Sequence, residues 1–82
     1  METNWKELIK RVAGNDRIIA CTLTKKELLK EFDDGYGGIE GKPFTAWSER
    51  YVYFPVYCDN VEWVARAPRN PCNKATYHVG GG

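Results

Sequence analysis

The sequence has few of the residues that catalytic and metal centres require. Its 82 residues include one histidine and three cysteines, and no two cysteines have C-x-x-C spacing. Structural zinc sites take their ligands in closely spaced pairs, and a disulfide framework needs an even number of cysteines. We therefore interpret Cys21, Cys58 and Cys72 as packed thiols of a reduced protein, and we expect no metal ion and no cofactor.

The single histidine, His78, leaves one enzymatic alternative open. A histidine beside Cys58 or Cys72 could activate the thiol as a nucleophile or share a metal ion with it. The local signatures of known cysteine enzymes are absent around both cysteines. We therefore expect that the protein is not an enzyme, and a small hydrolase or metalloprotein built on these residues is the third of three hypotheses.

A strong net charge and a long hydrophobic run are also absent. Lys and Arg total 12 against 11 Asp and Glu, so the net charge is +1 at pH 7, which gives little long-range attraction to nucleic acids or anionic membranes. No apolar run approaches the roughly 20 residues of a membrane-spanning helix, and residues 1–4 do not begin a signal peptide. We expect a cytoplasmic protein that does not associate with membranes.

The N-terminal part predicts a first helix over residues 5–13. Asn4 stands where an N-cap residue belongs, three positions before Glu7. Apolar residues then recur at i, i+3, i+4 and i+7 as far as Val12, which places them along one face of a helix. Gly14 follows as the residue that ends it.

A capping box at Thr24 and Glu27 predicts a second helix over residues 25–33. The short apolar run 17–23 between the helices predicts a strand or an extended link. Four glycines within residues 35–43 then predict a loop.

A chain of this length predicts a single domain. We divide it into a helical half over about 4–34, the glycine-rich loop 35–43, a sheet half over 44–79 and a flexible tail over 80–82.

The sheet half is rich in aromatic and β-branched residues, which favour strands. We expect a first strand over 44–47, a hairpin of strands 51–57 and 61–66, and a last short strand over 76–79. In the hairpin, Val52, Phe54 and Val56 share one face, while Tyr51, Tyr53 and Tyr57 share the other. Pro55 lacks an amide hydrogen, which places it at an edge or a bulge.

These elements predict an α+β fold in which two N-terminal helices pack on a three- or four-stranded antiparallel sheet. The helices should contact the apolar face of the sheet through seven side chains. They are Trp5, Leu8, Ile9, Val12, Leu28, Leu29 and Phe32. So small a core leaves aromatic side chains at the surface, where they are suited to contact a partner.

Five motifs in the chain carry a resemblance to a known family. The motifs are Asp33-Asp34-Gly35-Tyr36-Gly37-Gly38, Phe44-Thr45-Ala46-Trp47, Val52-Tyr53-Phe54-Pro55, Glu62-Trp63-Val64 and Pro68-Arg69-Asn70-Pro71. Over residues 18–81 the chain resembles a family of small accessory proteins from tailed phages and prophages of enteric bacteria. The resemblance implies a protein made in the cytoplasm of a bacterial host and directed against a host protein, such as a CRISPR effector or another defence component. It implies no catalytic residues.

The leading hypothesis is therefore a non-enzymatic phage protein that binds a host protein and blocks it sterically. Aromatic and arginine side chains are the typical anchors of protein interfaces. The predicted anchors are Tyr51, Tyr53, Trp63, Arg66 and Arg69, joined by Asp33, Asp34 and Tyr36 from the acidic loop.

The second hypothesis is a single-stranded nucleic-acid-binding protein, because aromatic rings and arginines on a sheet can stack bases. A homo-oligomer is also open, since a strand rich in rings at a sheet edge invites self-pairing.

Overall fold

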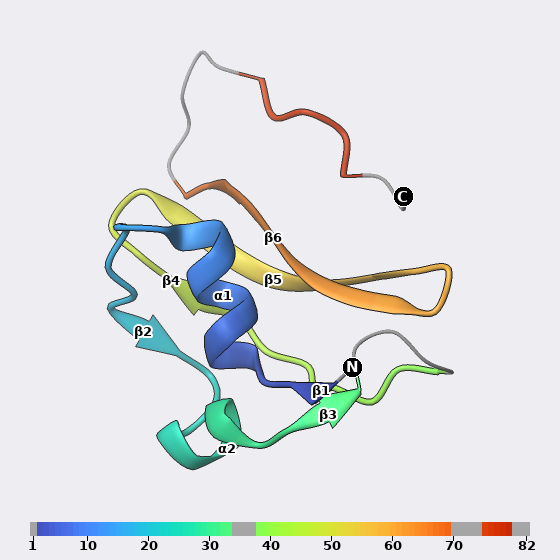
Figure 1. Ribbon diagram of the computed structural model, residues 1–82. Coiled ribbons are helices and arrows are strands. Elements are labelled where there is room, and N and C mark those ends of the chain that lie inside the picture. The colour runs from blue at the N-terminus through green and yellow to red at the C-terminus, as the bar shows by residue number, and fades with distance from the viewer. Residues whose placement is uncertain (1, 34–37, 70–74, 80–82) are drawn as a thin grey trace.

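A four-stranded antiparallel sheet with one long helix across it forms the body of the protein (Figure 1). The computed structural model describes residues 2–33, 38–69 and 75–79. The elements are β1 (Glu2–Thr3), α1 (Trp5–Ala13), β2 (Ala20–Cys21), α2 (Lys25–Leu29), β3 (Phe32–Asp33), β4 (Ala46–Trp47), β5 (Tyr51–Cys58) and β6 (Val61–Pro68). The main sheet has the order β2-β4-β5-β6, and β1 pairs with β3 in a second, two-stranded sheet. The predicted α+β class is confirmed, whereas the second sheet was not predicted.

Helix α1 has the predicted bounds, because both of its ends are fixed by local contacts. The Asn4 side chain accepts a hydrogen bond from the Glu7 amide at 2.8 Å. At the other end, Gly14 adopts φ +59° and its amide donates to the Lys10 carbonyl at 2.9 Å. Left-handed backbone of this kind favours glycine.

The second helix is shorter than predicted. Its capping box forms between Thr24 and Glu27, but α2 ends at Leu29 and Lys30 takes extended backbone. Phe32 then pairs with Thr3 in the two-stranded sheet, and its ring lies 4.7 Å from that of Trp5. This non-local burial outweighs continuation of the helix.

No side chain of α2 is fully buried, and Leu29 is 49% exposed. The expectation that α2 covers the sheet through Leu28 and Leu29 is therefore wrong for Leu29, while Leu28 is partly buried against the core.

The hairpin of β5 and β6 was predicted and extends further than expected, from the pair Cys58 and Val61 to the pair Tyr51 and Pro68. Asp59 and Asn60 make the turn with φ of 50° and 64°. Two positive φ values are those of a type I′ turn, whose twist matches that of the strands.

The shorter predicted strands are reduced to residue pairs or are absent. Only Ala20–Cys21 of the run 17–23 forms a strand, which pairs with β4, and β4 itself is Ala46–Trp47. The strand expected over 76–79 is wrong, because residues 75–79 have no regular secondary structure and all five are exposed. Side chains that remain in water provide no burial to offset the entropy of ordering a strand. Within the described ranges, no helix is long and apolar enough to cross a membrane.

The core is centred on Trp5, which is 1% exposed. Its ring lies 4.7 Å from that of Phe32 and 4.8 Å from that of Phe44, and its Nε1 donates to the Lys42 carbonyl at 2.9 Å. The backbone of Gly41 passes so close that a Cβ atom there would lie 2.4 Å from Trp5 Cζ2. Only glycine therefore allows the loop before β4 to reach this ring.

We expect Gly41→Ala to lower the free energy of unfolding by about 1–3 kcal/mol, because the added methyl group overpacks the core. Gly38→Ala is the matched control, since nothing lies within 4 Å of a Cβ atom there, and its effect should be within about 0.5 kcal/mol. Urea unfolding of both variants measures the difference. Equal stability of the two variants would contradict the close approach at Gly41.

Candidate protein-binding surface

The pairing register of β5 and β6 divides the side chains of the hairpin between two faces, because directly opposed residues share a face. The face toward α1 carries Tyr51, Tyr53, Pro55, Tyr57, Glu62, Val64, Arg66 and Pro68. The opposite face, here called the outer face, carries Val52, Phe54, Val56, Cys58, Val61, Trp63, Ala65 and Ala67. Every side chain of the outer face in this hairpin is apolar.

The two faces of β5 are exchanged relative to the prediction from the sequence, in which Val52, Phe54 and Val56 contact the helices. Tyr53 is instead the fully buried residue, at 0% exposure, and it packs in the same core cluster as Val64 and α1. Its hydroxyl donates to the Asp16 carboxylate, so the polar end of this tyrosine is satisfied inside the protein. Because that partner comes from the distant loop after α1, the pattern of the strand alone could not reveal it.

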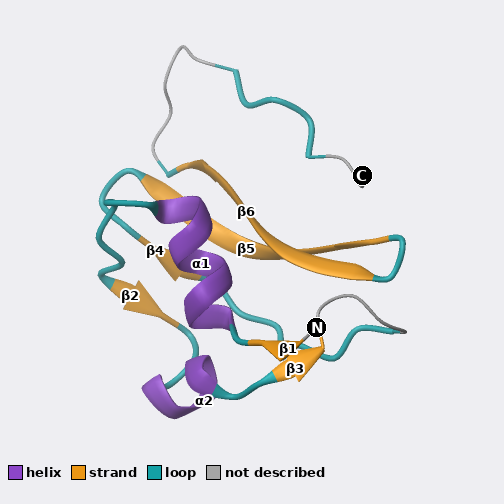
Figure 2. Cartoon of the chain, viewed as in Figure 1, coloured by secondary structure: helices purple, strands orange, loops and turns teal. Residues whose placement is uncertain are grey.

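The outer face continues across the sheet beyond the hairpin. Trp47 of β4 pairs with Val52, and Ala20 of β2 pairs with Trp47, so both lie on the same side. None of the outer-face residues belongs to the core cluster or packs against it. Figure 2 shows α1 crossing one side of the sheet. Helix α1 thus covers one face and leaves the other without a helical layer in the described part of the chain.

An apolar outer face is unusual for an antiparallel sheet. When one face packs on a core and the other meets water, strands alternate between apolar and polar residues. Here Trp63, Phe54 and Trp47 are only partly buried, and Val61 is 42% exposed. Strands β5 and β6 have eight residues each, which extend about 27 Å at a strand spacing of about 5 Å, so the outer face of the hairpin covers roughly 260 Å². The largest apolar patch on a monomer is often functional, so this face is the candidate binding surface.

The structure separates the aromatic and arginine residues that the sequence grouped as anchors. Trp63 lies on the outer face. Tyr53 is buried, so its predicted role as a surface anchor is wrong. Tyr51 and Arg66 lie on the α1 side, partly buried, with the Arg66 guanidinium carbon 4.1 Å from the Tyr51 ring centroid. Arg69 is exposed, and its Nη1 donates to the Ser48 carbonyl at 2.9 Å.

Of the three predicted contact residues in the acidic loop, only Asp33 is described, and it is not part of this surface. Asp33 is partly buried in β3, which belongs to the two-stranded sheet. Asp34 and Tyr36 lie outside the described residues. Phe54, Trp47 and the outer valines were not among the contact residues predicted from the sequence, although they lie on the apolar outer face. The signal that could have found them is the unbroken apolar run from Tyr51 to Cys58, which is typical of a strand apolar on both faces.

A buried polar cluster links the loop after α1 to the sheet. Ser48 is 0% exposed, and its Oγ accepts hydrogen bonds from the amides of Tyr51 at 3.0 Å and Arg50 at 3.3 Å. Hydrogen bonds from Ser48 and then Tyr53 hold the pKa of Asp16 below its ordinary value. Burial, followed by the hydrogen bond to Asp16, raises the pKa of Tyr53. The cluster satisfies polar groups beneath α1, which is a structural role.

The described cysteines and the histidine lie apart from one another in sequence and in the sheet. Cys21 lies beside Ala46 on the α1 side of the sheet, whereas Cys58 lies on the outer face, and both are free thiols. His78 is exposed, and Cys72 lies outside the described residues. Among the described residues, no three metal-ligating side chains come together.

Comparisons of the chain with protein-family models, curated proteins and solved structures found no match. The resemblance to phage accessory proteins therefore remains a prediction from the sequence motifs.

Asp16 gives the fold a defined dependence on pH. Its pKa is lower in the folded chain than in the unfolded chain, so the ionised carboxylate stabilises the fold above about pH 4 and this stabilisation is lost as the pH falls through the folded pKa. We expect Asp16→Asn to be less stable than the natural protein at pH 7, with a difference that shrinks toward pH 2. Urea unfolding at several pH values measures this difference.

Asp59→Asn is the matched control, because Asp59 is an exposed carboxylate in a turn that accepts asparagine equally well. Its stability should follow that of the natural protein at every pH. A constant gap between Asp16→Asn and the natural protein down to pH 2 would contradict the lowered pKa of Asp16.

Proposed function

We propose that this chain is a non-enzymatic protein that binds another protein through its outer face and blocks it sterically. The observation that carries the proposal is the apolar character of every outward side chain of β5 and β6, none of which packs with the core. Water-exposed apolar surface is unfavourable. Covering this face with the apolar surface of a partner removes it from water and provides the driving force for association.

The centre of the proposed interface is formed by Trp63, Phe54 and Trp47. When a side chain becomes ordered in an interface, a large aromatic ring buries more area than other side chains do. Tryptophan is also enriched among the residues that contribute most of the binding free energy. The Arg69 amide donates to the Arg50 carbonyl at 2.8 Å, which extends the β5–β6 ladder by one pair. By register, these two arginines lie at one end of the outer face, where they supply a polar rim.

The proposed partner is a protein of a bacterial host. This choice rests on the resemblance of the sequence motifs to phage accessory proteins, which implies action inside a bacterial cell against a defence component such as a CRISPR effector. Steric blocking fits a small protein that binds through a sheet face, because such a face can cover a functional surface of the partner without any chemistry of its own.

A nucleic-acid-binding function is the second candidate, favoured by three rings on one sheet face. The distribution of charge weakens it, because β5 and β6 place no Lys or Arg on the outer face and Arg66 lies on the opposite side. Among the described residues of the extended hairpin, the cations on the outer side are Arg50 and Arg69, at one end. To neutralise the phosphates along a nucleic-acid strand, a protein needs Lys or Arg side chains spread along its binding groove.

We expect the double variant Phe54→Thr/Trp63→Thr to keep its fold and lose partner binding. Threonine favours strands, and neither ring contributes to the core. Capture from a bacterial lysate with the natural chain, followed by binding measurements with the purified partner, should show at least a tenfold loss of affinity, as for truncated interface anchors.

Tyr57→Thr is the matched control, because Tyr57 is an aromatic residue of the same hairpin, 40% exposed, on the opposite face. It should bind like the natural protein. Equal binding by the double variant and the control would remove the outer face from the mechanism.

A fluorescent single-stranded oligonucleotide tests the second candidate. We expect no saturable binding at 20 mM salt, since the outer face lacks distributed cations. Tight binding that weakens steeply as salt rises would instead favour the nucleic-acid function.

A further inference from the structure

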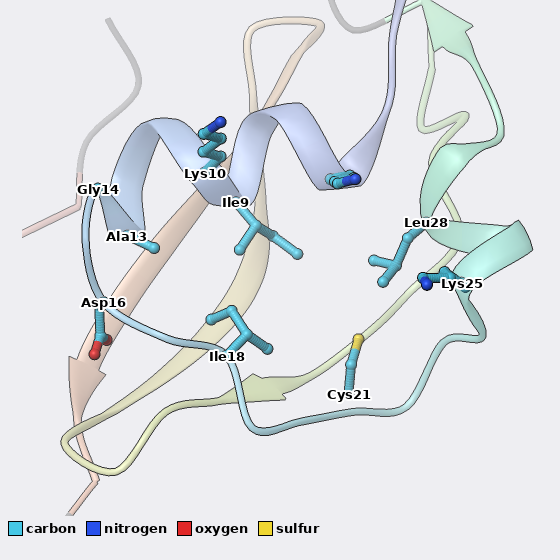
Figure 3. Close-up of a pocket in the computed structure, with 10 residues that line it drawn as sticks. Ile9, Lys10, Ala13, Gly14, Asp16, Ile18, Cys21, Lys25 and Leu28 are labelled. Atoms are coloured by element: carbon cyan, nitrogen blue, oxygen red, sulfur yellow. The ribbon is translucent and has the colours of Figure 1, made fainter.

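An apolar hollow of about 310 Å³ lies on the opposite side of the sheet from the outer face. Its wall is formed by α1, the segment that leads to β2, and α2. Figure 3 shows Ile9, Ile18, Cys21 and Leu28 pointing toward this common space from three different segments of the chain. The volume is at the lower end of the range for small-ligand sites.

The hollow exists because the β2 side of the sheet is incompletely covered. Helix α1 packs across β6, while α2 is only five residues long and buries none of them fully. Ile18, Cys21 and Leu28 are therefore only partly buried, although all three pack against the core. An apolar ligand would complete this side of the core.

The rim of the hollow is positively charged. Lys6 and Lys10 from α1 and Lys25 from α2 line it and are exposed. Within the described ranges, none of the three is paired with a carboxylate. The one acidic lining residue, Asp16, already accepts hydrogen bonds from Tyr53 and Ser48. The rim thus presents three cations against one carboxylate that is occupied elsewhere.

We infer that the hollow binds a small anionic amphiphile, a carboxylate with a single unbranched alkyl chain. The chain lies among Ile9, Ile18, Cys21 and Leu28, and the carboxylate lies at the lysine rim. An apolar interior with a few charged groups at its mouth is the usual arrangement of sites for such ligands. This site is independent of the outer face, so either can fail without the other.

The length of the alkyl chain provides the first test. Each further methylene that enters the hollow should tighten binding about fourfold. Hexanoate, octanoate and decanoate, each below its micelle concentration, are titrated into the intact natural protein and followed by methyl NMR. The methyl groups of Ile9, Ile18 and Leu28 should shift, those of Val52 and Val56 on the outer face should not, and affinity should rise along the series. Shifts confined to the outer face, or no saturable shift with decanoate, would overturn the proposal.

Cys21 provides an independent readout inside the hollow. In a Cys58→Ser/Cys72→Ser background it is the one remaining thiol, and decanoate should slow its alkylation by iodoacetamide at least fivefold. Unchanged alkylation at a concentration of decanoate that saturates the NMR shifts would place the ligand elsewhere and overturn the site.

The lysine rim is tested by charge removal. Lys10→Gln/Lys25→Gln should weaken decanoate binding about tenfold and leave decanol binding unchanged, because the alcohol carries no charge. Lys26→Gln/Lys30→Gln, which removes two cations of the same region that do not line the hollow, is the matched control. Equal effects of the two double variants would show that general charge, and not the rim, attracts the carboxylate, and would overturn this assignment.

Discussion

The burial of Trp5 is the constraint on which the rest of the structure depends. Its ring joins α1 to β3 through Phe32 and to the loop before β4 through Phe44 and the Lys42 carbonyl. The same loop is tied to β6, because the buried Glu62 carboxylate accepts hydrogen bonds from the amides of Glu40 at 2.8 Å and Gly41 at 3.1 Å. Trp5 and Glu62 together therefore hold the helix, the small sheet and the edge strand β6 of the main sheet against the same loop.

This arrangement explains why the described part of the chain covers only one face of the sheet. A domain of this size has enough chain for one covering layer, and α1 supplies it. The apolar outer face can be exposed to water because its side chains partly cover one another. Ala65 is only 6% exposed although it lies outside the core cluster, since it stands directly across from Phe54. The rings thus protect the small residues between them while remaining available to a partner.

Local signals made α1 and the hairpin predictable. The N-cap at Asn4, the stop at Gly14 and the turn at Asp59 and Asn60 each act within a few residues, so the sequence pattern contains the whole cause. The end of α2 was missed because Phe32 is drawn into a strand by Thr3 and Trp5, far away in the sequence. Tertiary contacts of this kind override local propensity.

The orientation of the sheet depends on a partner that the sequence pattern does not reveal. Valines and a phenylalanine on one side of β5 indicate a core-facing surface, and tyrosines on the other indicate a solvent-facing one. That inference assumes that a tyrosine hydroxyl needs water, but Asp16 and Ser48 provide its polar environment under α1. The hydroxyl of Tyr53 has its hydrogen-bond partner inside the protein, so Tyr53 faces the core. Because side chains alternate between the two faces of a strand, Val52, Phe54 and Val56 then all lie on the outer face. The polar contacts of one buried hydroxyl group thereby help to decide which side of the sheet faces α1 and which side α1 leaves uncovered.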